Sequence, residues 1–416
     1  YQVNHTLRLV AGFEGDGSSL YHDLAGAQDA QFNAYLRLGR FEVLSASPEL
    51  FFLRSGRQVV TRPMTGTAAR GRWTEDDEAR RDRLLSSEKD RAENVMIVDL
   101  LRNDLGRVAR FGTVRVDSLL EAERYPTLWQ LTSTISGEVP EDVGTAEVFA
   151  ALFPCGSVTG APKISATSII AGLETQPRGI YCGAIGYLAP PGEAVSARFS
   201  VAIRTVVVDR VASIAVYGTG GGITYDSTPS GEFDEAVLKA EILTERRPRF
   251  AVLETMRWEP AGGYPLLDDH LRRLEGSARY FGYSCDPLAV RRALEEAVRG
   301  RPASAMVRCL LHRDGRVETE VSDAPPTGEA ARVAVDATPV DTASPFLYHK
   351  TTHRTVYHDA LGRHPGADDV LLVNSEGEIT EATTANVAVR FGDEWVTPPL
   401  SAGCLPGVYR AAMLRE

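Results

Sequence analysis

The chain has 416 residues, with 45 lysines and arginines against 56 acidic residues and a formal net charge of −11. Its 43% hydrophobic and 24% charged content is that of a globular protein and excludes a disordered chain. The acidic balance argues against a nucleic-acid or anionic-membrane surface, and no run of about 18–20 apolar residues predicts a membrane-spanning helix.

The N-terminal segment YQVNHTLRLV lacks the features of a signal peptide. The five cysteines are odd in number and widely spaced, which favours free thiols in a reducing, cytoplasmic setting. Only four of the basic residues are lysines: Lys89, Lys163, Lys239 and Lys350. Because arginine cannot donate an amine to a Schiff base, each lysine that remains is a candidate for specific chemistry.

The first half of the chain mixes strand and helix patterns. Residues 34–64 alternate apolar and polar side chains between turn signals, which predicts half-buried antiparallel strands. Much antiparallel sheet with interspersed helices indicates an α+β fold rather than a doubly wound one. Further helices are predicted over 91–111 and 162–174, and further strands over 183–190, 198–208 and 212–224.

A domain boundary is predicted where one pattern ends and another begins. Residues 231–250 favour a long helix that ends in a charged, proline-containing stretch, and residues 250–258 begin a new strand-like run. We therefore divide the chain into domains 1–247 and 248–416.

Two acidic pairs stand out on the predicted helices. Asp90 and Glu93 are three residues apart on one helix, and Glu232 and Glu235 on another. This spacing puts both carboxylates of a pair on one helix face. Four carboxylates without nearby histidine or cysteine ligands suit a hard ion such as Mg²⁺. The alternative is two solvated faces with a salt bridge from Glu235 to Lys239.

Two loop-like segments are candidates for anion binding. Gly220–Gly222 closes an apolar strand and predicts either an anion-binding nest or a plain turn. Residues 156–163 do not fit the phosphate-loop pattern, so they exclude a nucleotide site there and leave a carboxylate-binding loop open. Because no histidine lies between His22 and His270, acid–base chemistry in this half must use carboxylates, lysine, tyrosine or water.

These segments together resemble the chorismate-utilising enzymes, namely anthranilate synthase large subunit, aminodeoxychorismate synthase component I and isochorismate synthase. The TRPM…GT and RAENVMIVDLLRND blocks are most similar to the aminodeoxychorismate branch. The resemblance implies a chorismate-binding α/β sandwich that lacks its N-terminal part. The matching blocks run in order across residues 1–245: YQVNHTLR, SASPELFF, TRPMTGTAARG, KDRAENVMIVDLLRNDLGRV, GSVTGAPK, YCGAIGYL, VAIRTVVV, TGGGI and EFDEAVLKA.

The resemblance implies roles for individual residues. Glu93 and Glu235 would coordinate Mg²⁺, with Asp90 and Glu232 behind them through water, and the ion would hold the ring carboxylate of chorismate. Glu49, in SPEL, would be the general acid/base that helps a ring hydroxyl leave. The substrate's carboxylates would contact Arg204, Lys239 and amides near Gly220 and Gly222, and the pocket would be lined by Gly66, Thr67, Ser157 and Tyr181.

Two positions depart from the family pattern. Thr65 stands at the catalytic position where aminodeoxychorismate synthases usually carry a lysine proposed to attack the ring, and Gln130 stands where many members have histidine. A threonine hydroxyl cannot replace an amine nucleophile without an adjacent base. Direct attack by ammonia, or a less efficient reaction, is the alternative to a covalent lysine.

The second half carries one lysine, Lys350, within FLYHKTTHRTVYHDAL. The blocks LETMRW, LLDDHLRRLEGSARYFG, YHKTTHR, LLVNSEGEITEATTANVAV and TPPLSAGCLPGVYRAAML, over residues 252–414, resemble the fold-type IV pyridoxal-phosphate enzymes: branched-chain and D-amino-acid aminotransferases and aminodeoxychorismate lyase. The resemblance implies an α+β, branched-chain aminotransferase-like domain that stops before its usual C-terminal end.

This second resemblance also assigns residues to the cofactor. Lys350 would hold pyridoxal 5'-phosphate as a Schiff base, Glu381 would keep the pyridine nitrogen protonated, and Arg273 would grip the phosphate. The backbone N–H groups of Gly407, Val408 and Tyr409 and the hydroxyl of Thr384 would complete the phosphate site.

The fusion of these halves favours one leading hypothesis. Chorismate would be aminated to 4-amino-4-deoxychorismate, from which the second half would eliminate pyruvate to leave 4-aminobenzoate, a folate precursor. No glutaminase signature is present, so ammonia would come from a separate glutamine amidotransferase subunit or from solution. A homodimer of the chain would form through the second, pyridoxal-phosphate domain. The alternatives are an anthranilate- or isochorismate-type synthase joined to an aminotransferase, and a non-catalytic truncated partner of the amidotransferase.

Overall fold

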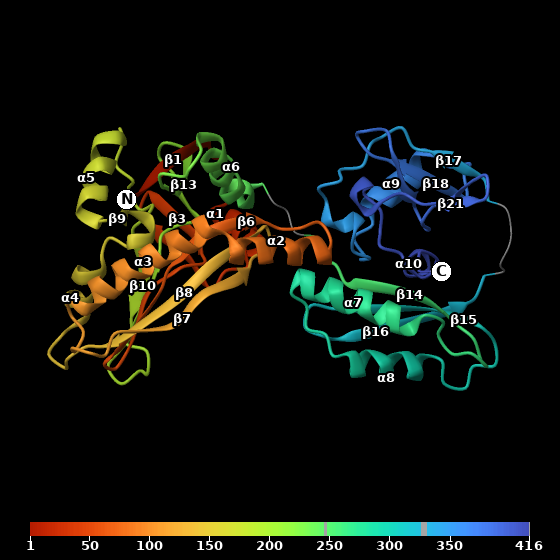
Figure 1. Ribbon diagram of the computed structural model, residues 1–416, viewed down its shortest axis with the longest axis horizontal. Helices are drawn as coiled ribbons and strands as arrows, with labels where there is room; N and C mark the ends of the chain where they lie inside the picture. The colour runs from red at the N-terminus through yellow and green to blue at the C-terminus, as the bar shows by residue number, and fades with distance from the viewer. Residues whose placement is uncertain (245–247, 326–330, 416) are drawn as a thin grey trace. The chain divides into compact units, whose positions relative to one another are not determined.

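The computed structural model describes residues 1–244, 248–325 and 331–415. The chain forms two compact units, residues 1–70 with 79–247 and residues 71–78 with 248–416 (Figure 1). The predicted boundary adjoins residues 245–247, which lie outside the described residues. None of the described helices combines the length and apolar content that crossing a bilayer requires.

The first unit is built on two antiparallel sheets. The first has the order β2-β3-β12-β13-β1-β9, and the second has the order β10-β11-β4-β5-β8-β6 with β7 also pairing with β8. The strands of the first sheet are β1 (Gln2–Gly12), β2 (Phe32–Leu38), β3 (Phe41–Ser47), β9 (Gly160–Ala161), β12 (Thr205–Asp209) and β13 (Ile214–Ile223). Those of the second are β4 (Leu50–Ser55), β5 (Gln58–Arg62), β6 (Met64–Ala69), β7 (Arg115–Arg124), β8 (Leu128–Glu138), β10 (Ala184–Leu188) and β11 (Ala197–Val201).

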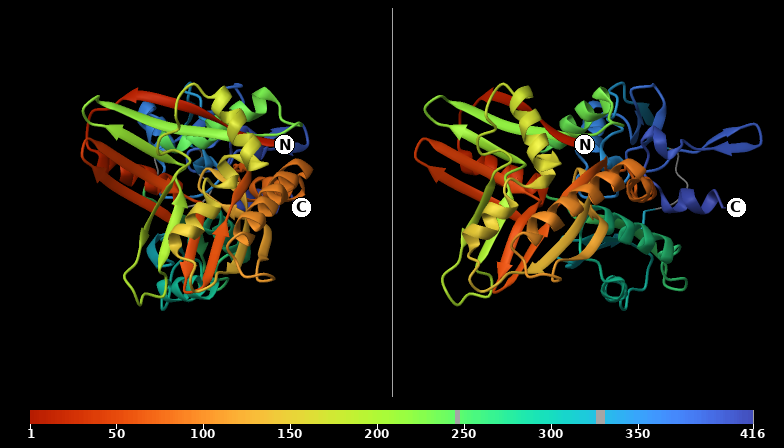
Figure 2. Two further views of the ribbon diagram at one scale, coloured as in Figure 1. Left: turned by 90° about the vertical axis from the view of Figure 1, so that its left-hand side faces the viewer. Right: turned by 60° about the vertical axis from the view of Figure 1, so that its left-hand side comes forward.

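Helices cover these sheets with their apolar faces. Helix α3 begins after the N-cap Ser87, whose side chain accepts from the amide of Asp90, and lies across β6 and β8 (Figures 1 and 2). Its buried residues Ile97, Leu101 and Leu105 join the main core of the unit. The helices of this unit are α1 (Gly17–Gln28), α2 (Thr74–Ser86, shared with the second unit), α3 (Glu88–Gly106), α4 (Thr145–Leu152), α5 (Lys163–Leu173) and α6 (Pro229–Ala240), with 3₁₀ turns η1 (Gly156–Val158) and η2 (Glu241–Leu243).

The α+β prediction is confirmed, but one predicted strand is broken. Residues 198–208 form β11 in the second sheet and β12 in the first. Arg204 lies in the break with φ of 51°, a left-handed conformation that cannot continue a strand. The chain therefore crosses from one sheet to the other at this point.

The second unit contains a three-stranded antiparallel sheet, β14-β15-β16, on which α7 and α8 pack. A second sheet has the order β17-β18-β19, and β20 and β21 form a hairpin that projects from the unit (Figure 2). The strands are β14 (Val252–Trp258), β15 (Ala305–Leu311), β16 (Val317–Asp323), β17 (Val333–Val335), β18 (Asp369–Val373), β19 (Ile379–Ala382), β20 (Val389–Phe391) and β21 (Glu394–Val396). The helices are α7 (Leu267–Phe281), α8 (Pro287–Ala297), α9 (Thr355–Arg363) and α10 (Val408–Met413), with 3₁₀ turns η3 (Pro345–Leu347) and η4 (Leu400–Ala402).

Residues 71–78 belong to the second unit by their contacts. The hydroxyl of Tyr280 donates to the carbonyl of Gly71 at 2.7 Å, and the rings of Trp73 and Tyr348 have centroids 5.4 Å apart. The second unit thus includes a segment that precedes most of the first unit in the chain.

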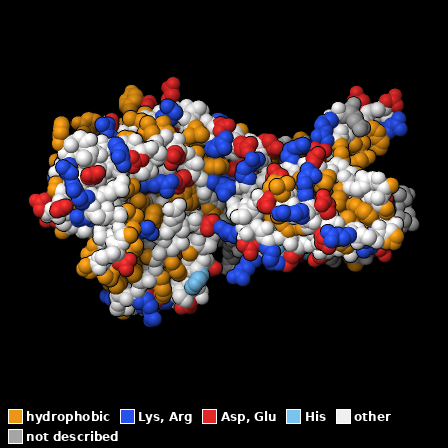
Figure 3. Space-filling model, turned by 90° about the horizontal axis from the view of Figure 1, so that it is seen from below, with side chains coloured by type: hydrophobic (Ala, Val, Ile, Leu, Met, Phe, Trp, Pro, Cys, Tyr) orange, Lys and Arg blue, Asp and Glu red, His pale blue; other side chains and the backbone are white. Residues whose placement is uncertain are grey.

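Over the face in Figure 3, charged side chains of both signs are interspersed.

Candidate active sites

Two crossovers between the sheets position the first site. Glu49 lies in the crossover from β3 to β4, and Arg204 in the crossover from β11 to β12. The amide of Val201 donates to the carbonyl of Glu49 at 3.1 Å, and the amide of Ala46 donates to the carbonyl of Arg204 at 3.0 Å. These backbone bonds hold the two predicted substrate-facing residues side by side.

Glu49 is 1% exposed. The hydroxyl of Ser157 donates to Glu49 Oε1 at 2.5 Å, and Cys155 Sγ lies 3.1 Å from the same hydroxyl. Burial raises the pKa of Glu49 to about 7, against the opposing effect of the Ser157 hydrogen bond. A carboxyl group with this pKa can donate and accept a proton near neutral pH.

A narrow cavity of about 60 Å³ collects the residues around Glu49. The ammonium of Lys239 donates to the carbonyl of Gly220 at 2.9 Å and pairs with Glu235 at 2.6 Å, while Arg204 donates to the carbonyl of Lys239. Gln130 also lines the cavity, and its Oε1 has no hydrogen-bond partner among the described residues. The predicted residues that line this cavity are Glu49, Ser157, Tyr181, Arg204, Gly220 and Lys239.

The glycine cluster differs from both predicted forms. Gly220–Gly222 continues strand β13 in register with β1, and none of the three has a positive φ. The glycines are needed for close approach instead, because a Cβ at Gly220 would lie 2.0 Å from the carbonyl oxygen of His5. The segment therefore forms neither a nest nor a turn, and Gly222 does not line the cavity.

Strand β6 carries the predicted residues Thr65, Gly66 and Thr67, none of which lines this cavity. Thr65 is 7% exposed, and its hydroxyl has no hydrogen-bond partner among the described residues. Gly66 has φ of +74°, and a Cβ there would lie 3.0 Å from Asp90 Oδ1. Only glycine combines this conformation with this close approach. Thr67 lies against the Glu235 carboxylate.

The four predicted metal ligands face one another across α3 and α6. Burial raises the pKa of Glu93 to about 8, and the charges of Glu235, Asp90 and Glu232 add to this effect. Burial also raises the pKa of Asp90. For Glu235, burial is outweighed by the Lys239 ammonium, which lowers the pKa of this carboxyl group.

Lys89, to which the sequence assigns no role, lies among these carboxylates. Its ammonium is 2.9 Å from Glu232 Oε1 and 3.9 Å from Glu93 Oε1. Within the described ranges, no group of three or more histidine, cysteine or acidic side chains is arranged to hold a metal ion. The donor chemistry nevertheless fits Mg²⁺, because Glu93 Oε1 and Glu232 Oε2 are buried carboxylate oxygens without a hydrogen-bond partner in the described part of the chain.

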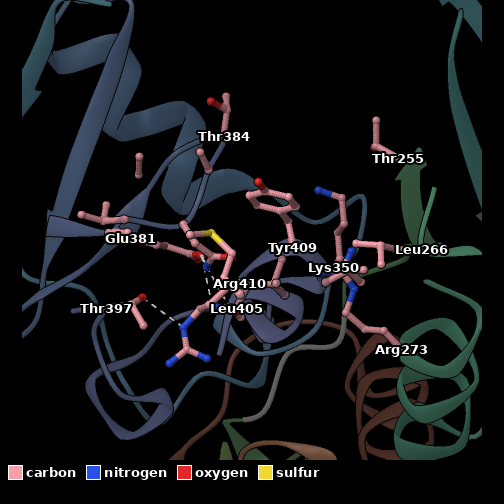
Figure 4. A pocket seen from close by; sticks show the side chains of 18 of the residues that line it. Thr255, Leu266, Arg273, Lys350, Glu381, Thr384, Thr397, Leu405, Tyr409 and Arg410 are labelled. Atoms are coloured by element: carbon pink, nitrogen blue, oxygen red, sulfur yellow. Dashed lines mark hydrogen bonds between the residues drawn. The ribbon is translucent and has the colours of Figure 1, made fainter. Parts of the chain in front are cut away.

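The second unit holds a larger cavity of about 590 Å³. All of the predicted cofactor residues line it, and Figure 4 shows Lys350 and Arg273 on one side with Glu381 and Thr384 on the other. Burial lowers the pKa of Lys350 to about 8, and the Arg273 charge adds to the effect. These lining residues are Arg273, Lys350, Glu381, Thr384, Gly407, Val408 and Tyr409.

Glu381 is held by three donors. The hydroxyl of Tyr357 donates to its Oε1 at 2.7 Å, and the side chain of Asn386 and the amide of Leu405 donate to its Oε2 at 3.2 and 3.1 Å. Burial raises the pKa of Glu381 to about 7, while the hydrogen bonds from Tyr357 and Leu405 oppose the rise. Tyr357 and Asn386 fall in the quoted blocks or beside them, but nothing in the sequence indicates that they meet Glu381.

The predicted phosphate-binding groups are partly engaged within the protein. Arg273 forms a two-point contact with Glu254. The amide of Gly407 donates to the carbonyl of Leu405 at 2.8 Å, and the hydroxyl of Thr384 donates to Asp369. The prediction of a phosphate site from backbone amides then rests on Val408 and Tyr409.

A buried lysine with a lowered pKa, facing a cavity and a buried carboxyl group, fits a cofactor that carries an aldehyde and a ring nitrogen. In the described part of the chain, the Lys350 ammonium has neither a hydrogen bond nor an ion pair. The donor set of the second cavity therefore fits pyridoxal phosphate.

Two family models match the chain in succession. The model described as chorismate binding enzyme matches residues 1–245, and that described as amino-transferase class IV matches residues 251–416. The chain is 42% identical over 235 residues to aminodeoxychorismate synthase component 1 of Escherichia coli, which covers 56% of this chain and 51% of that protein. It is 40% identical over 242 residues to anthranilate synthase component 1 of Aquifex aeolicus, which covers 58% of this chain and 48% of that protein.

A solved structure agrees with the first match. Anthranilate synthase component I from Streptococcus pneumoniae TIGR4 has a TM-score of 0.52 at 33% identity, covering 59% of this chain and 53% of that one. The chain spans about half the length of the curated relatives it matches. It belongs to the chorismate binding enzyme family, here fused to a class IV amino-transferase domain.

Proposed function

We propose that this chain makes 4-aminobenzoate, the folate precursor, in two steps. Chorismate and ammonia give 4-amino-4-deoxychorismate and water in the first unit, and elimination from that product gives 4-aminobenzoate and pyruvate in the second. The observation that carries the proposal is the presence on one chain of two separate sites, one around the buried acid Glu49 and one around Lys350. The similarity of the first unit to aminodeoxychorismate synthase component 1 supports the assignment of the first step to that unit.

In the first step, Glu49 donates a proton to the ring hydroxyl so that it leaves as water. Its pKa of about 7 keeps a protonated fraction at neutral pH. Arg204 and Lys239 bind the carboxylates of chorismate. Because Thr65 is not an amine nucleophile, ammonia attacks the ring directly.

Binding of Mg²⁺ at the acidic residues of the first unit is part of the proposal for the first step. Glu93 and Glu235 would hold the ion directly, and Asp90 and Glu232 would hold it through water. A bound divalent cation would neutralise the ring carboxylate and the carboxylates that now repel one another. Lys89 would have to move away from Glu232, because its ammonium occupies the space beside that carboxylate.

In the second step, bound pyridoxal phosphate supplies an electron sink for the charge that develops next to the substrate amine. Lys350 would attach the cofactor and would move the proton at the substrate carbon, and its pKa of about 8 allows the neutral amine to form close to neutral pH. Glu381 would hold a proton on the ring nitrogen, and Arg273 would contact the phosphate.

The partners of the chain are also proposals. The relatives are named component 1, which supports a separate glutamine amidotransferase as the source of ammonia. A homodimer through the second unit and a cytoplasmic location complete the proposal.

One incubation tests the assignment. The chain is mixed with chorismate, an ammonium salt, Mg²⁺ and pyridoxal phosphate, and the aromatic product is identified by chromatography and mass spectrometry. 4-Aminobenzoate with an equal amount of pyruvate is the expected result. Anthranilate as the product would show that the first unit aminates another ring position, and isochorismate would show that it adds water in place of ammonia. Absence of turnover with ammonia would favour a non-catalytic subunit.

A further inference from the structure

The guanidinium of Arg273 is fixed by a buried carboxylate on the neighbouring strand. Its Nε and Nη2 donate to Glu254 Oε1 and Oε2, each at 2.7 Å. The Glu254 side chain is 2% exposed and that of Arg273 is 12% exposed. Such a two-point contact fixes both the position and the plane of the guanidinium.

Two further contacts extend this arrangement. His270, one turn before Arg273 on α7, has its Nδ1 2.8 Å from Glu254 Oε2. The third nitrogen of Arg273, Nη1, donates to the carbonyl of Pro406 at 3.2 Å. Arg273 thereby connects β14 and α7 to the turn that carries Gly407, Val408 and Tyr409.

Glu254 itself does not line the cavity, whereas its neighbour Thr255 and Arg273 both do. Burial opposes the ionisation of Glu254, but Arg273 and His270 outweigh it and lower the pKa of this carboxyl group. The carboxylate therefore stays charged behind the cavity wall. It can act on a bound anion only through the side chains that it contacts and that line the cavity, Arg273 at two points and His270 at one.

We propose that Glu254 is a positioning residue for the phosphate of the cofactor, acting through the Arg273 guanidinium and the Pro406 carbonyl. The inference rests on the proposed cofactor of the second unit. It also changes the sequence prediction for Arg273, because the Nε/Nη2 edge faces Glu254, and the phosphate must be met by N–H groups outside that edge.

The two possible roles of the Glu254–Arg273 pair predict different binding data. If the pair only stabilises the fold, breaking it should weaken the binding of every ligand of the cavity to the same extent. If the pair positions Arg273, breaking it should weaken the binding of an aldehyde that carries phosphate and leave the binding of the same aldehyde without phosphate unchanged. Pyridoxal 5'-phosphate and pyridoxal are therefore the two probes.

The test compares the full chain with its Glu254→Gln variant, in which an amide N–H replaces one acceptor of Arg273. Dissociation constants for both probes are measured by absorbance titration. We expect pyridoxal phosphate to bind about tenfold more weakly, by analogy with the loss of metal affinity when a group that orients a metal ligand is removed. We expect the dissociation constant of pyridoxal to change by less than about twofold. The matched control is Glu275→Gln, which removes an exposed carboxylate from α7, the helix that carries Arg273. This variant should bind both probes as the parent chain does.

Further variants separate the remaining outcomes. Glu254→Gln combined with Arg273→Ala should bind pyridoxal phosphate no more weakly than Arg273→Ala alone. If thermal unfolding shows that Glu254→Gln is not folded, Glu254→Asp keeps the charge and should lose part of the preference for phosphate. Equal weakening of both probes, or no change in either, overturns the inference, whereas a parent chain that binds neither probe overturns the proposed cofactor as well.

Discussion

Ser157 donates a 2.5 Å hydrogen bond to Glu49, a residue 108 positions earlier in the chain. Burial raises the pKa of Glu49, and this hydrogen bond opposes the rise, so that the pKa settles at about 7. The hydroxyl therefore sets the pH range in which the proposed acid holds its proton.

Replacing Ser157 by alanine should move that range upward. Without the hydroxyl, the ionised form of Glu49 loses a donor, and its pKa rises further above its usual value. The pH profile of kcat/KM for chorismate amination should shift to higher pH, with a lower rate overall. Ser168→Ala, which changes an exposed serine on α5, controls for the loss of a hydroxyl. Protonation of ammonia affects the profiles of both variants equally. An unshifted pH profile for Ser157→Ala would therefore contradict the role of the Ser157–Glu49 hydrogen bond.

The buried acid also makes the stability of the first unit depend on pH. Glu49 has a pKa of about 7 in the folded protein against an ordinary value of 4.5. Between these values the unfolded chain is ionised while the folded chain holds its proton, so a rising pH favours unfolding. This loss of unfolding free energy is absent below pH 4.5 and reaches its full value, about 3 kcal/mol, above pH 7.

Glu49→Gln removes this titration. The variant should gain stability relative to the parent chain as pH rises from 5 to 8, measured as the difference between their urea-unfolding free energies at each pH. Glu147→Gln, on α4 and exposed, should follow the parent chain at every pH. A difference between Glu49→Gln and the parent that stays constant with pH would mean that Glu49 is ionised in the folded protein throughout.

The sequence predicts the strands within residues 34–64, the helices α3, α5 and α6 and the strands β10 and β13, because alternation and helical periodicity are local; it makes no prediction for β1, β7, β8, α1, α2 or α4. It does not predict the break at Arg204, since the run 198–208 is apolar on both sides of a residue whose left-handed backbone is imposed by the crossing between sheets. It also misses the extended form of Gly220–Gly222, because a glycine run allows a turn, and only the neighbouring strand β1 shows that close approach is the reason for it.

For the sites, many of the residues that the family blocks select line two cavities, whereas Thr65, Gly66, Thr67 and Gly222 line neither. The blocks do not indicate how the selected residues pair. Lys89 precedes the acidic pair in the sequence, and only the fold brings it, from the start of α3, to Glu232 on α6. Glu254 lies in the quoted block LETMRW without a role, because its partner Arg273 is on another element. Pairings between elements depend on tertiary packing, which one sequence does not contain.

Lys350→Ala should separate the two proposed steps. The variant cannot attach the cofactor, so the absorbance band of lysine-bound pyridoxal phosphate should be lost, and borohydride reduction should label the parent chain only, at Lys350. Amination should continue, since the first site shares no residue with this cavity. 4-Amino-4-deoxychorismate should therefore accumulate in place of 4-aminobenzoate, and continued release of 4-aminobenzoate by the variant would place the second site elsewhere.

Lys163 is expected to act in the fold rather than in binding. Its ammonium pairs with Asp104 at 2.5 Å and donates to the carbonyl of Leu152 at 3.0 Å, with the two side chains 15% and 5% exposed. Lys163→Met keeps the side chain's length and leaves Asp104 as a buried, uncompensated charge. The variant should lose about 3 kcal/mol of stability in urea unfolding.

The double variant Lys163→Met with Asp104→Asn tests the cause of that loss. Removing the second charge should restore part of the stability, because an unpaired buried carboxylate costs more than an amide in the same place. If Lys163 instead binds a carboxylate of chorismate, the single variant should raise KM with little change in unfolding free energy, and the double variant should not recover. Measurement of both quantities on both variants decides between a structural ion pair and a substrate contact in the loop at residues 156–163.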